Sequence, residues 1–198
     1  ASDVYKRQIK SLATLPMSIS VVGIAIGAII ATRVMSLIGR KYGFILASIG
    51  NTLFSILAAY SIYSQNFILF CFANVFIGIG MAFTHQYRFA AAESVNKEMA
   101  PKAISIILFG GIISAFLGPS LANFSKDLIS ENLYVGSYLA LALLTFIPSI
   151  LFLFYEDKSK LEINLQYKGR SYIELISQPR FFQAVCASAF GYAIMTFL

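Results

Sequence analysis

The sequence predicts an all-α, polytopic membrane helix bundle, and three observations lead to this fold class. Hydrophobic residues make up 58% of the chain and charged residues only 12%, whereas an ordinary soluble domain has about 45–50% apolar and about 25% charged residues. Five apolar runs are long enough to cross a bilayer as helices, which takes roughly 20 residues each. These runs do not alternate polar and apolar residues, as membrane-spanning strands do.

The five predicted helices follow one another with short polar connections. The first, second, fourth and fifth contain no Asp, Glu, Lys or Arg, and the third is charged only near its end. Charged groups are costly at the centre of a membrane helix, so this distribution supports five spans. In chain order they cover residues 12–32, 44–63, 67–92, 103–124 and 134–155. A further apolar run begins near Phe181.

Basic residues in the connections predict the orientation of the bundle. Because successive helices cross the membrane in opposite directions, ten basic residues fall on one side: Arg33, Arg40, Lys41, Lys97, Lys102, Lys158, Lys160, Lys168, Arg170 and Arg180. Lys126 and, outside residues 1–8, Lys10 belong to the opposite side. Because cytoplasmic loops carry the excess of Lys and Arg, the larger group is predicted to be cytoplasmic. The first run then enters from outside, and we expect another helix before it.

Composition divides the chain into four parts. Residues 1–8 lack an initiator Met and resemble translated adapter sequence, so we expect a non-native leader. Residues 9–156 form the transmembrane bundle with five complete helices. Residues 157–180 are polar and charged, which predicts a cytoplasmic central loop. Residues 181–198 are expected to start the next membrane helix.

The side chains argue against an enzyme. A single His and two isolated Cys cannot form a metal-ligand cluster, and neither a metalloprotease nor a nucleotide-binding motif is present. We therefore expect no catalytic residues, no metal and no cofactor. The net charge of +6 comes from basic residues between apolar runs, so membrane topology explains it without nucleic acid.

Two segments carry family-like motifs. The expected loop between the first two helices, residues 32–43, contains Gly39, Arg40 and Lys41, and Gly39 can form a tight turn at positive φ. The fourth helix has small residues at helical spacing followed by a proline: Gly111, Ser114, Gly118 and Pro119. Small residues permit close helix contact, and Pro119 bends the helix. Ordinary tight packing explains the same pattern equally well.

Together these features resemble the major facilitator superfamily. Its pattern between helices two and three is G-x-x-x-D-R-x-G-R-R/K, and Gly39, Arg40 and Lys41 match the end of it. Thr32, Ser36 and Leu37 stand where the family has Gly, Asp and Arg. The pair Gly118–Pro119 is similar to the end of the family's antiporter motif, with Ser114 in place of a Gly.

The resemblance implies a fold and a function. The chain would be the N-terminal half of a major-facilitator fold, with helices two to six and the start of seven. It would act in the bacterial inner membrane as a multi-pass secondary transporter of a small molecule, driven by protons. Its partners would be the substrate, protons, the lipid bilayer and the missing C-terminal half. A multidrug efflux antiporter, or a sensor or assembly protein on the same fold, remains an alternative.

Candidate site residues form two groups. His85 and Arg88 are ionisable groups inside a span, and such groups are expected to be functional. We expect Asn74, Gly78, Met81, His85 and Arg88 to share one helix face. Arg88, His85, Asn74 and Asn51 are the candidates for substrate or proton coupling. Alternatively, Arg88 extends to the interface, and Asn51 joins helices by hydrogen bonds.

The second group is the cytoplasmic gate. The family resemblance implies that Gly39, Arg40, Lys41 and Glu93 belong to it, with Glu93 pairing with Arg40 or Lys41 at the helix ends. The small residues Gly111, Ser114, Gly118 and Pro119 are assigned to helix packing and a hinge.

Overall fold

The computed structural model describes residues 14–129, 134–155 and 177–197. The chain divides into two compact units, residues 1–161 and 162–198, and each is described by itself. The predicted leader at residues 1–8, Lys10 and most of the predicted central loop lie outside the described residues.

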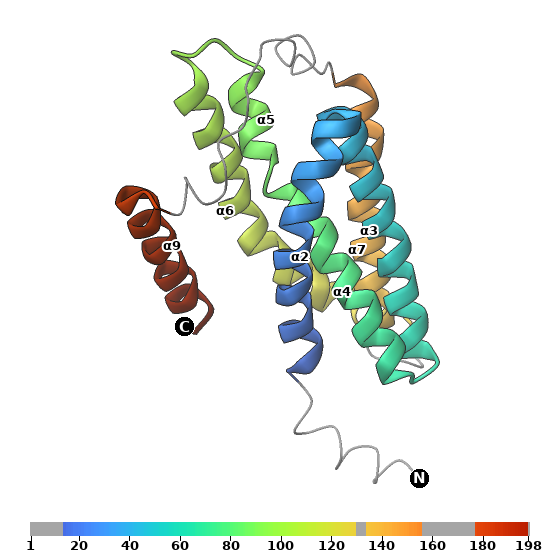
Figure 1. The fold of residues 1–198 in the computed structure, drawn as a ribbon. Helices are drawn as coiled ribbons and strands as arrows, with labels where there is room; N and C mark the ends of the chain where they lie inside the picture. The colour runs from blue at the N-terminus through green and yellow to red at the C-terminus, as the bar shows by residue number, and fades with distance from the viewer. Residues whose placement is uncertain (1–13, 130–133, 156–176, 198) are drawn as a thin grey trace. The chain divides into compact units, whose positions relative to one another are not determined.

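The described residues are helical and contain no strand (Figure 1). Unit 1 contains α2 (Leu15–Ile38), α3 (Arg40–Tyr63), α4 (Phe67–Thr84), α5 (Tyr87–Glu93), α6 (Ala100–Ser125), α7 (Val135–Leu151) and the 3-10 turn η2 (Phe152–Phe154). The described part of unit 2 is α9 (Pro179–Phe197). Five stretches are long and apolar enough to cross a membrane, so the all-α, multi-span prediction is confirmed.

The connection between α2 and α3 is shorter than predicted. We expected a loop over residues 32–43, but α2 continues to Ile38 and α3 starts at Arg40. Gly39 alone separates them, with φ 87° and ψ 164°, a conformation that is essentially limited to glycine. The predicted turn at positive φ is confirmed, and it fixes Arg40 in the first turn of α3.

The connection between α3 and α4 is also tight. Gln65 has φ 54°, in the left-handed region. The Asn66 side chain then caps α4, because its Oδ1 accepts the backbone N–H of Leu69 at 3.1 Å. This cap satisfies a backbone donor that α4 would otherwise leave free at its start.

The third predicted span is not one continuous helix. α4 ends at Thr84, His85 and Gln86 form a turn, and α5 runs from Tyr87 to Glu93 (Figure 1). The expected stripe of Asn74, Gly78, Met81, His85 and Arg88 is therefore not carried by one helix, because Arg88 lies on α5. Asn74 and Gly78 are buried, whereas Met81, His85 and Arg88 are exposed.

Glycines bring α2 and α4 into direct backbone contact. A Cβ atom at Gly23 would collide with the carbonyl of Val75, and one at Gly27 with the backbone of Ile79. From the other side, a Cβ at Gly78 would collide with the carbonyl of Ser20. Small residues at four-residue spacing allow this approach between membrane helices.

The second helix pair is α3 with α7, and α3 also packs against α4. Aromatic rings support these contacts: Phe54 of α3 stacks on Phe76 of α4 with centroids 4.3 Å apart. Between α3 and α7, the Thr52 and Thr145 hydroxyls are hydrogen-bonded at 3.2 Å. These contacts make α2, α3, α4 and α7 one packed group.

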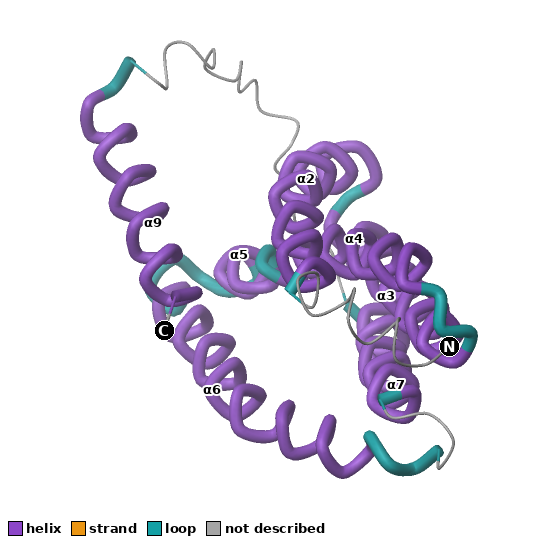
Figure 2. Tube along the Cα trace, turned by 90° about the horizontal axis from the view of Figure 1, so that it is seen from below, coloured by secondary structure: helices purple, strands orange, loops and turns teal. Residues whose placement is uncertain are grey.

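Helix α6 lies apart from that group (Figure 2). Its main neighbours are α5 and α7, and Ser125 is its only buried residue among those described. Helix α6 contacts α7 near the C-terminal end of α6, where the Ser137 hydroxyl donates to the Ala122 carbonyl at 2.8 Å. Most of the α6 surface thus faces no described residue.

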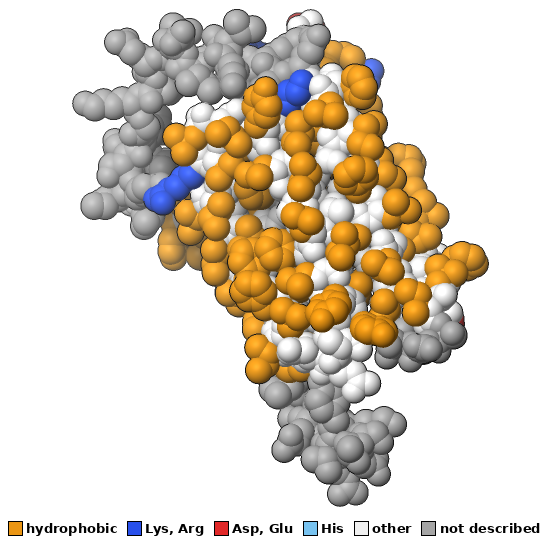
Figure 3. All heavy atoms as spheres, turned by 90° about the vertical axis from the view of Figure 1, so that its right-hand side faces the viewer, with side chains coloured by type: hydrophobic (Ala, Val, Ile, Leu, Met, Phe, Trp, Pro, Cys, Tyr) orange, Lys and Arg blue, Asp and Glu red, His pale blue; other side chains and the backbone are white. Residues whose placement is uncertain are grey.

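The outer surface of unit 1 is apolar (Figure 3). Large side chains such as Met17, Leu37, Ile68, Ile106 and Phe116 are at least 70% exposed. Exposed hydroxyls in the helices bond to their own backbone; Ser114, for example, donates to the Gly110 carbonyl at 2.9 Å. Both features suit hydrocarbon surroundings, where polar groups must find partners inside the protein. Unit 1 is therefore built as a multi-pass membrane bundle.

Candidate functional site

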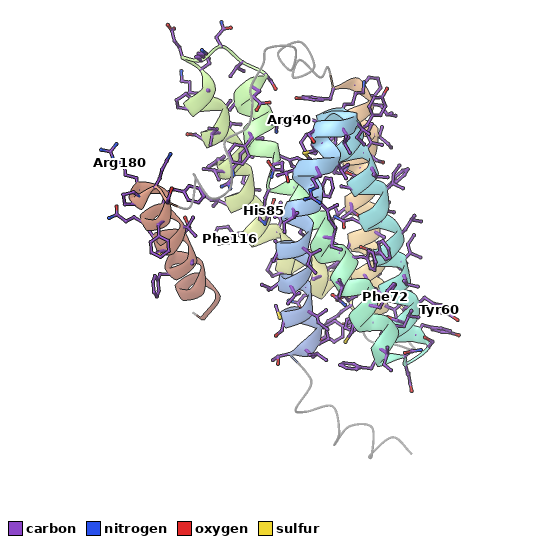
Figure 4. All side chains as sticks on the ribbon, in the orientation of Figure 1. Arg40, Tyr60, Phe72, His85, Phe116 and Arg180 are labelled. Carbon is purple, nitrogen blue, oxygen red and sulfur yellow. The ribbon has the colours of Figure 1, made fainter. Side chains whose placement is uncertain are left out.

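The predicted gate residues Arg40 and Glu93 form an ion pair. Arg40 Nη2 donates to Glu93 Oε1 at 2.5 Å, and this is the one ion pair found among the described residues. The side chains are 19% and 49% exposed, respectively. Arg40 lies near the upper end of the bundle in Figure 4. The pair connects the start of α3 to the end of α5.

An aromatic cluster lies next to this ion pair in the fold. Phe44, which is fully buried, has its ring centroid 4.8 Å from those of both Tyr87 and Phe152. Tyr155 completes the cluster at 6.5 Å from Phe44. The Tyr87 side chain is also hydrogen-bonded to Ser48. The cluster holds α5 against α3 and η2, so Glu93 is presented to Arg40 by a docked helix.

Basic side chains gather at the same end of the bundle. The directions of the helices bring Arg33, Arg40 and Lys41 to the end of the bundle where α5 stops and α6 starts. Lys97 and Lys102 lie at this same end, in the α5–α6 connection and the first turn of α6. Lys126 lies at the opposite end. Because cytoplasmic loops carry the excess of Lys and Arg, this difference between the two ends predicts that the ion pair is on the cytoplasmic side.

Arg88 and His85, the predicted coupling residues, are both exposed in unit 1. The Arg88 guanidinium lies 5.0 Å from the centroid of the neighbouring Phe89 ring, and it forms no ion pair with a described residue. His85 lies at the turn between α4 and α5 and is labelled in Figure 4. Both side chains therefore keep donor groups that the described residues do not occupy.

The two predicted asparagines lie in helix interfaces. The Asn74 amide donates to the Phe70 carbonyl at 2.8 Å and is hydrogen-bonded to Tyr138 of α7. The Asn51 amide is buried against Gly80 of α4. The structure does not bring them together with Arg88, and nothing in it tests their predicted role in coupling.

The predicted hinge residues all belong to α6. A Cβ atom placed on Gly111 or Gly118 would meet nothing within 4 Å among the described residues. Pro119 lies inside the helix, which continues to Ser125. The close contacts expected here are instead found between α2 and α4, and the hinge assignment stays a prediction.

Comparison with known proteins gives the family. The model of the Major Facilitator Superfamily matches residues 7–198, which is nearly the whole chain. The chain belongs to the major facilitator superfamily.

A curated relative of this major-facilitator chain is a riboflavin transporter, RfnT, from Brucella anthropi. The two are 31% identical over 190 residues, which is 95% of this chain and 48% of the relative. The chain thus spans about half the length of the curated relative that it matches. No solved structure matches the chain.

Several positions that shape this major-facilitator bundle were not anticipated. The Gly23–Gly27 pair is a G-x-x-x-G pattern in an apolar helix, so a motif search had a signal for it. The Tyr87–Ser48 and Thr52–Thr145 contacts join residues far apart in sequence. A single sequence holds no local signal for such pairs.

Proposed function

We propose that this chain is part of a proton-driven secondary transporter in a bacterial inner membrane, with riboflavin as the first substrate to test. The observation that carries the proposal is the 31% identity to a riboflavin transporter over 95% of the chain. Membership of the superfamily and the five membrane-spanning helices support it.

In this proposal the Arg40–Glu93 pair stabilises the closed cytoplasmic side. Transporters of this architecture work by rocking two halves around a site near the bilayer midplane. An ion pair at the cytoplasmic helix ends favours one end state without blocking the other, because a partly exposed pair contributes only about 0.2–1 kcal/mol. Gly39 and Lys41 flank Arg40 and belong to the same gate.

Substrate and proton coupling are assigned to the α4–α5 turn. Riboflavin carries a planar flavin ring with carbonyl oxygens, and Arg88 supplies planar donors that suit such acceptors. An imidazole can both accept and release a proton, which makes His85 the candidate for coupling. The exposure of both side chains supports this assignment, because a substrate needs donors that have no partner. Asn74 and Asn51 stay proposed contributors through the helices that they join.

Helix α6 is proposed to bend during the transport cycle. Gly111, Ser114 and Gly118 add no bulk to its surface, and Pro119 removes one backbone donor. Its few contacts in unit 1 support this role, since a loosely packed helix moves at lower free-energy cost.

The experiment uses the full-length protein in bacterial cells that need external riboflavin and lack their own uptake system. Expression should restore growth on low riboflavin and uptake of labelled riboflavin. The Arg88→Ala variant should lose uptake at equal membrane abundance, while Lys126→Ala, a basic residue at the other end, should keep it. Uptake equal to the empty vector, with the protein present in the membrane, would exclude riboflavin import.

A further inference from the structure

Two polar atoms in the middle of α3 are buried without a hydrogen-bond partner among the described residues. They are Asn51 Oδ1 and Ser55 Oγ. Asn51 is 6% exposed and Ser55 is 0% exposed. The two residues are four apart on one helix, so their side chains lie one turn from each other on the same face.

Other buried hydroxyls of α3 do have partners. Ser48 is hydrogen-bonded to Tyr87, and Ser61 donates to the Ala58 carbonyl at 2.7 Å. Most serines inside the helices of unit 1 satisfy themselves by bonding to their own backbone, as Ser61 does, and Ser55 does not. A buried polar atom without a partner destabilises the fold, so an unsatisfied pair on one face calls for a shared ligand.

The α4 backbone leaves room for the Asn51 amide at Gly80. A Cβ atom on Gly80 would collide with the Oδ1, Cγ and Nδ2 atoms of Asn51. Only glycine therefore lets the amide occupy this position in the α3–α4 interface. Gly50, next to Asn51 on α3, has nothing within 4 Å of its ideal Cβ position among the described residues, so it makes no comparable contact.

We infer that Asn51, Ser55 and Gly80 form a site for one buried water molecule between α3 and α4. Water donates to the Asn51 carbonyl oxygen and exchanges a hydrogen bond with the Ser55 hydroxyl, so it satisfies both atoms. Buried waters typically hold otherwise unsatisfied polar groups in this way. A hard metal cation is the poorer fit because it requires a fuller shell of oxygen ligands, usually with carboxylates, and α3 and α4 contain no Asp or Glu.

The first test is a high-resolution map of the full-length protein in lipid. The expected result is density within hydrogen-bond distance of both Asn51 Oδ1 and Ser55 Oγ. In a separate melting experiment, replacing sodium with choline should leave the melting temperature unchanged. A direct hydrogen bond between the two side chains with no density between them would overturn the inference. A lower melting temperature in choline than in sodium would also overturn it, because it would indicate a cation.

The second test is a double-mutant cycle on thermal unfolding of the full-length protein. Asn51→Leu and Ser55→Ala each remove one partner of the water. The fall in melting temperature of the double variant should be no greater than that of the worse single variant, since the second change removes a partner that the water has already lost. Additive falls would contradict a shared ligand.

A glycine comparison covers the case in which those variants do not fold. Gly80→Ala should lower the melting temperature by several degrees, because the new methyl group displaces the Asn51 amide. Gly50→Ala is the matched control on α3, where the new methyl group meets nothing within 4 Å among the described residues. It should leave the melting temperature unchanged or higher, as alanine favours the helix. Equal effects of the two variants would show that no site exists at Gly80.

Discussion

Arg40 and Glu93 form an ion pair although they are 53 positions apart in the chain. Gly39 places Arg40 in the first turn of α3, and the aromatic cluster of Phe44, Tyr87, Phe152 and Tyr155 holds α5, which ends at Glu93. The pair therefore depends on the folding of α3, α5 and η2 together.

Exchanging the two charges tests the gate. Arg40→Glu and Glu93→Arg each place like charges opposite one another. Each should reduce transport by about 1.4- to fivefold, as expected for loss of about 0.2–1 kcal/mol from one end state. The double variant restores opposite charges and should recover most of the transport rate. A double variant as slow as the worse single variant would show that the pair does not act as a gate.

The hydroxyl of Tyr87 tests the docking of α5. Tyr87→Phe keeps the ring in the aromatic cluster but removes the hydrogen bond to Ser48, and should lower the free energy of unfolding by about 1 kcal/mol. Tyr60→Phe is the control, because Tyr60 is 59% exposed. Equal stability of both variants in a thermal-unfolding assay would argue against a docked α5.

The glycine contact between α2 and α4 predicts a large stability effect. Gly27→Val would push a branched side chain into the backbone of Ile79 and should cost about 1–3 kcal/mol through overpacking. Gly50→Val on α3 has open space and should leave stability unchanged or slightly higher, because valine has a higher helix propensity than glycine. Membrane abundance and melting temperature measure both, and a Gly27 variant as stable as the Gly50 variant would contradict the contact.

Arg88 is exposed, so its removal should affect transport and not folding. Loss of a hydrogen bond from a charged group costs about 1.5–3 kcal/mol, which corresponds to a fall in transport of about tenfold or more for Arg88→Ala. The melting temperature should stay within one or two degrees of the wild type. Normal transport by this variant would remove Arg88 from the site.

Much of the fold follows from the sequence because each span depends on local hydrophobicity. The five charge-poor runs correspond to α2, α3, the α4–α5 pair, α6 and α7 with η2. The exact ends were less predictable: helix 67–92 divides at His85 and Gln86 although neither residue breaks helices. Contacts made by Tyr87 farther along the chain, with Phe44 and Ser48, accompany the change of direction.

The candidate site was only partly predictable. The pairing of Arg40 with Glu93 could be predicted because both residues were expected at helix ends on the same side of the membrane. The burial of Asn51 against Gly80 could not be foreseen, since it depends on how α3 and α4 face each other. Periodicity gives the faces of a helix but not the partner that each face meets.

The most direct measurement of the proposed function is flux of labelled riboflavin into proteoliposomes that contain the purified full-length protein. With an imposed pH gradient, riboflavin should accumulate above its external concentration, and a protonophore should abolish the accumulation. Flux no greater than in protein-free liposomes, or accumulation that persists with the protonophore, would contradict a proton-driven riboflavin transporter.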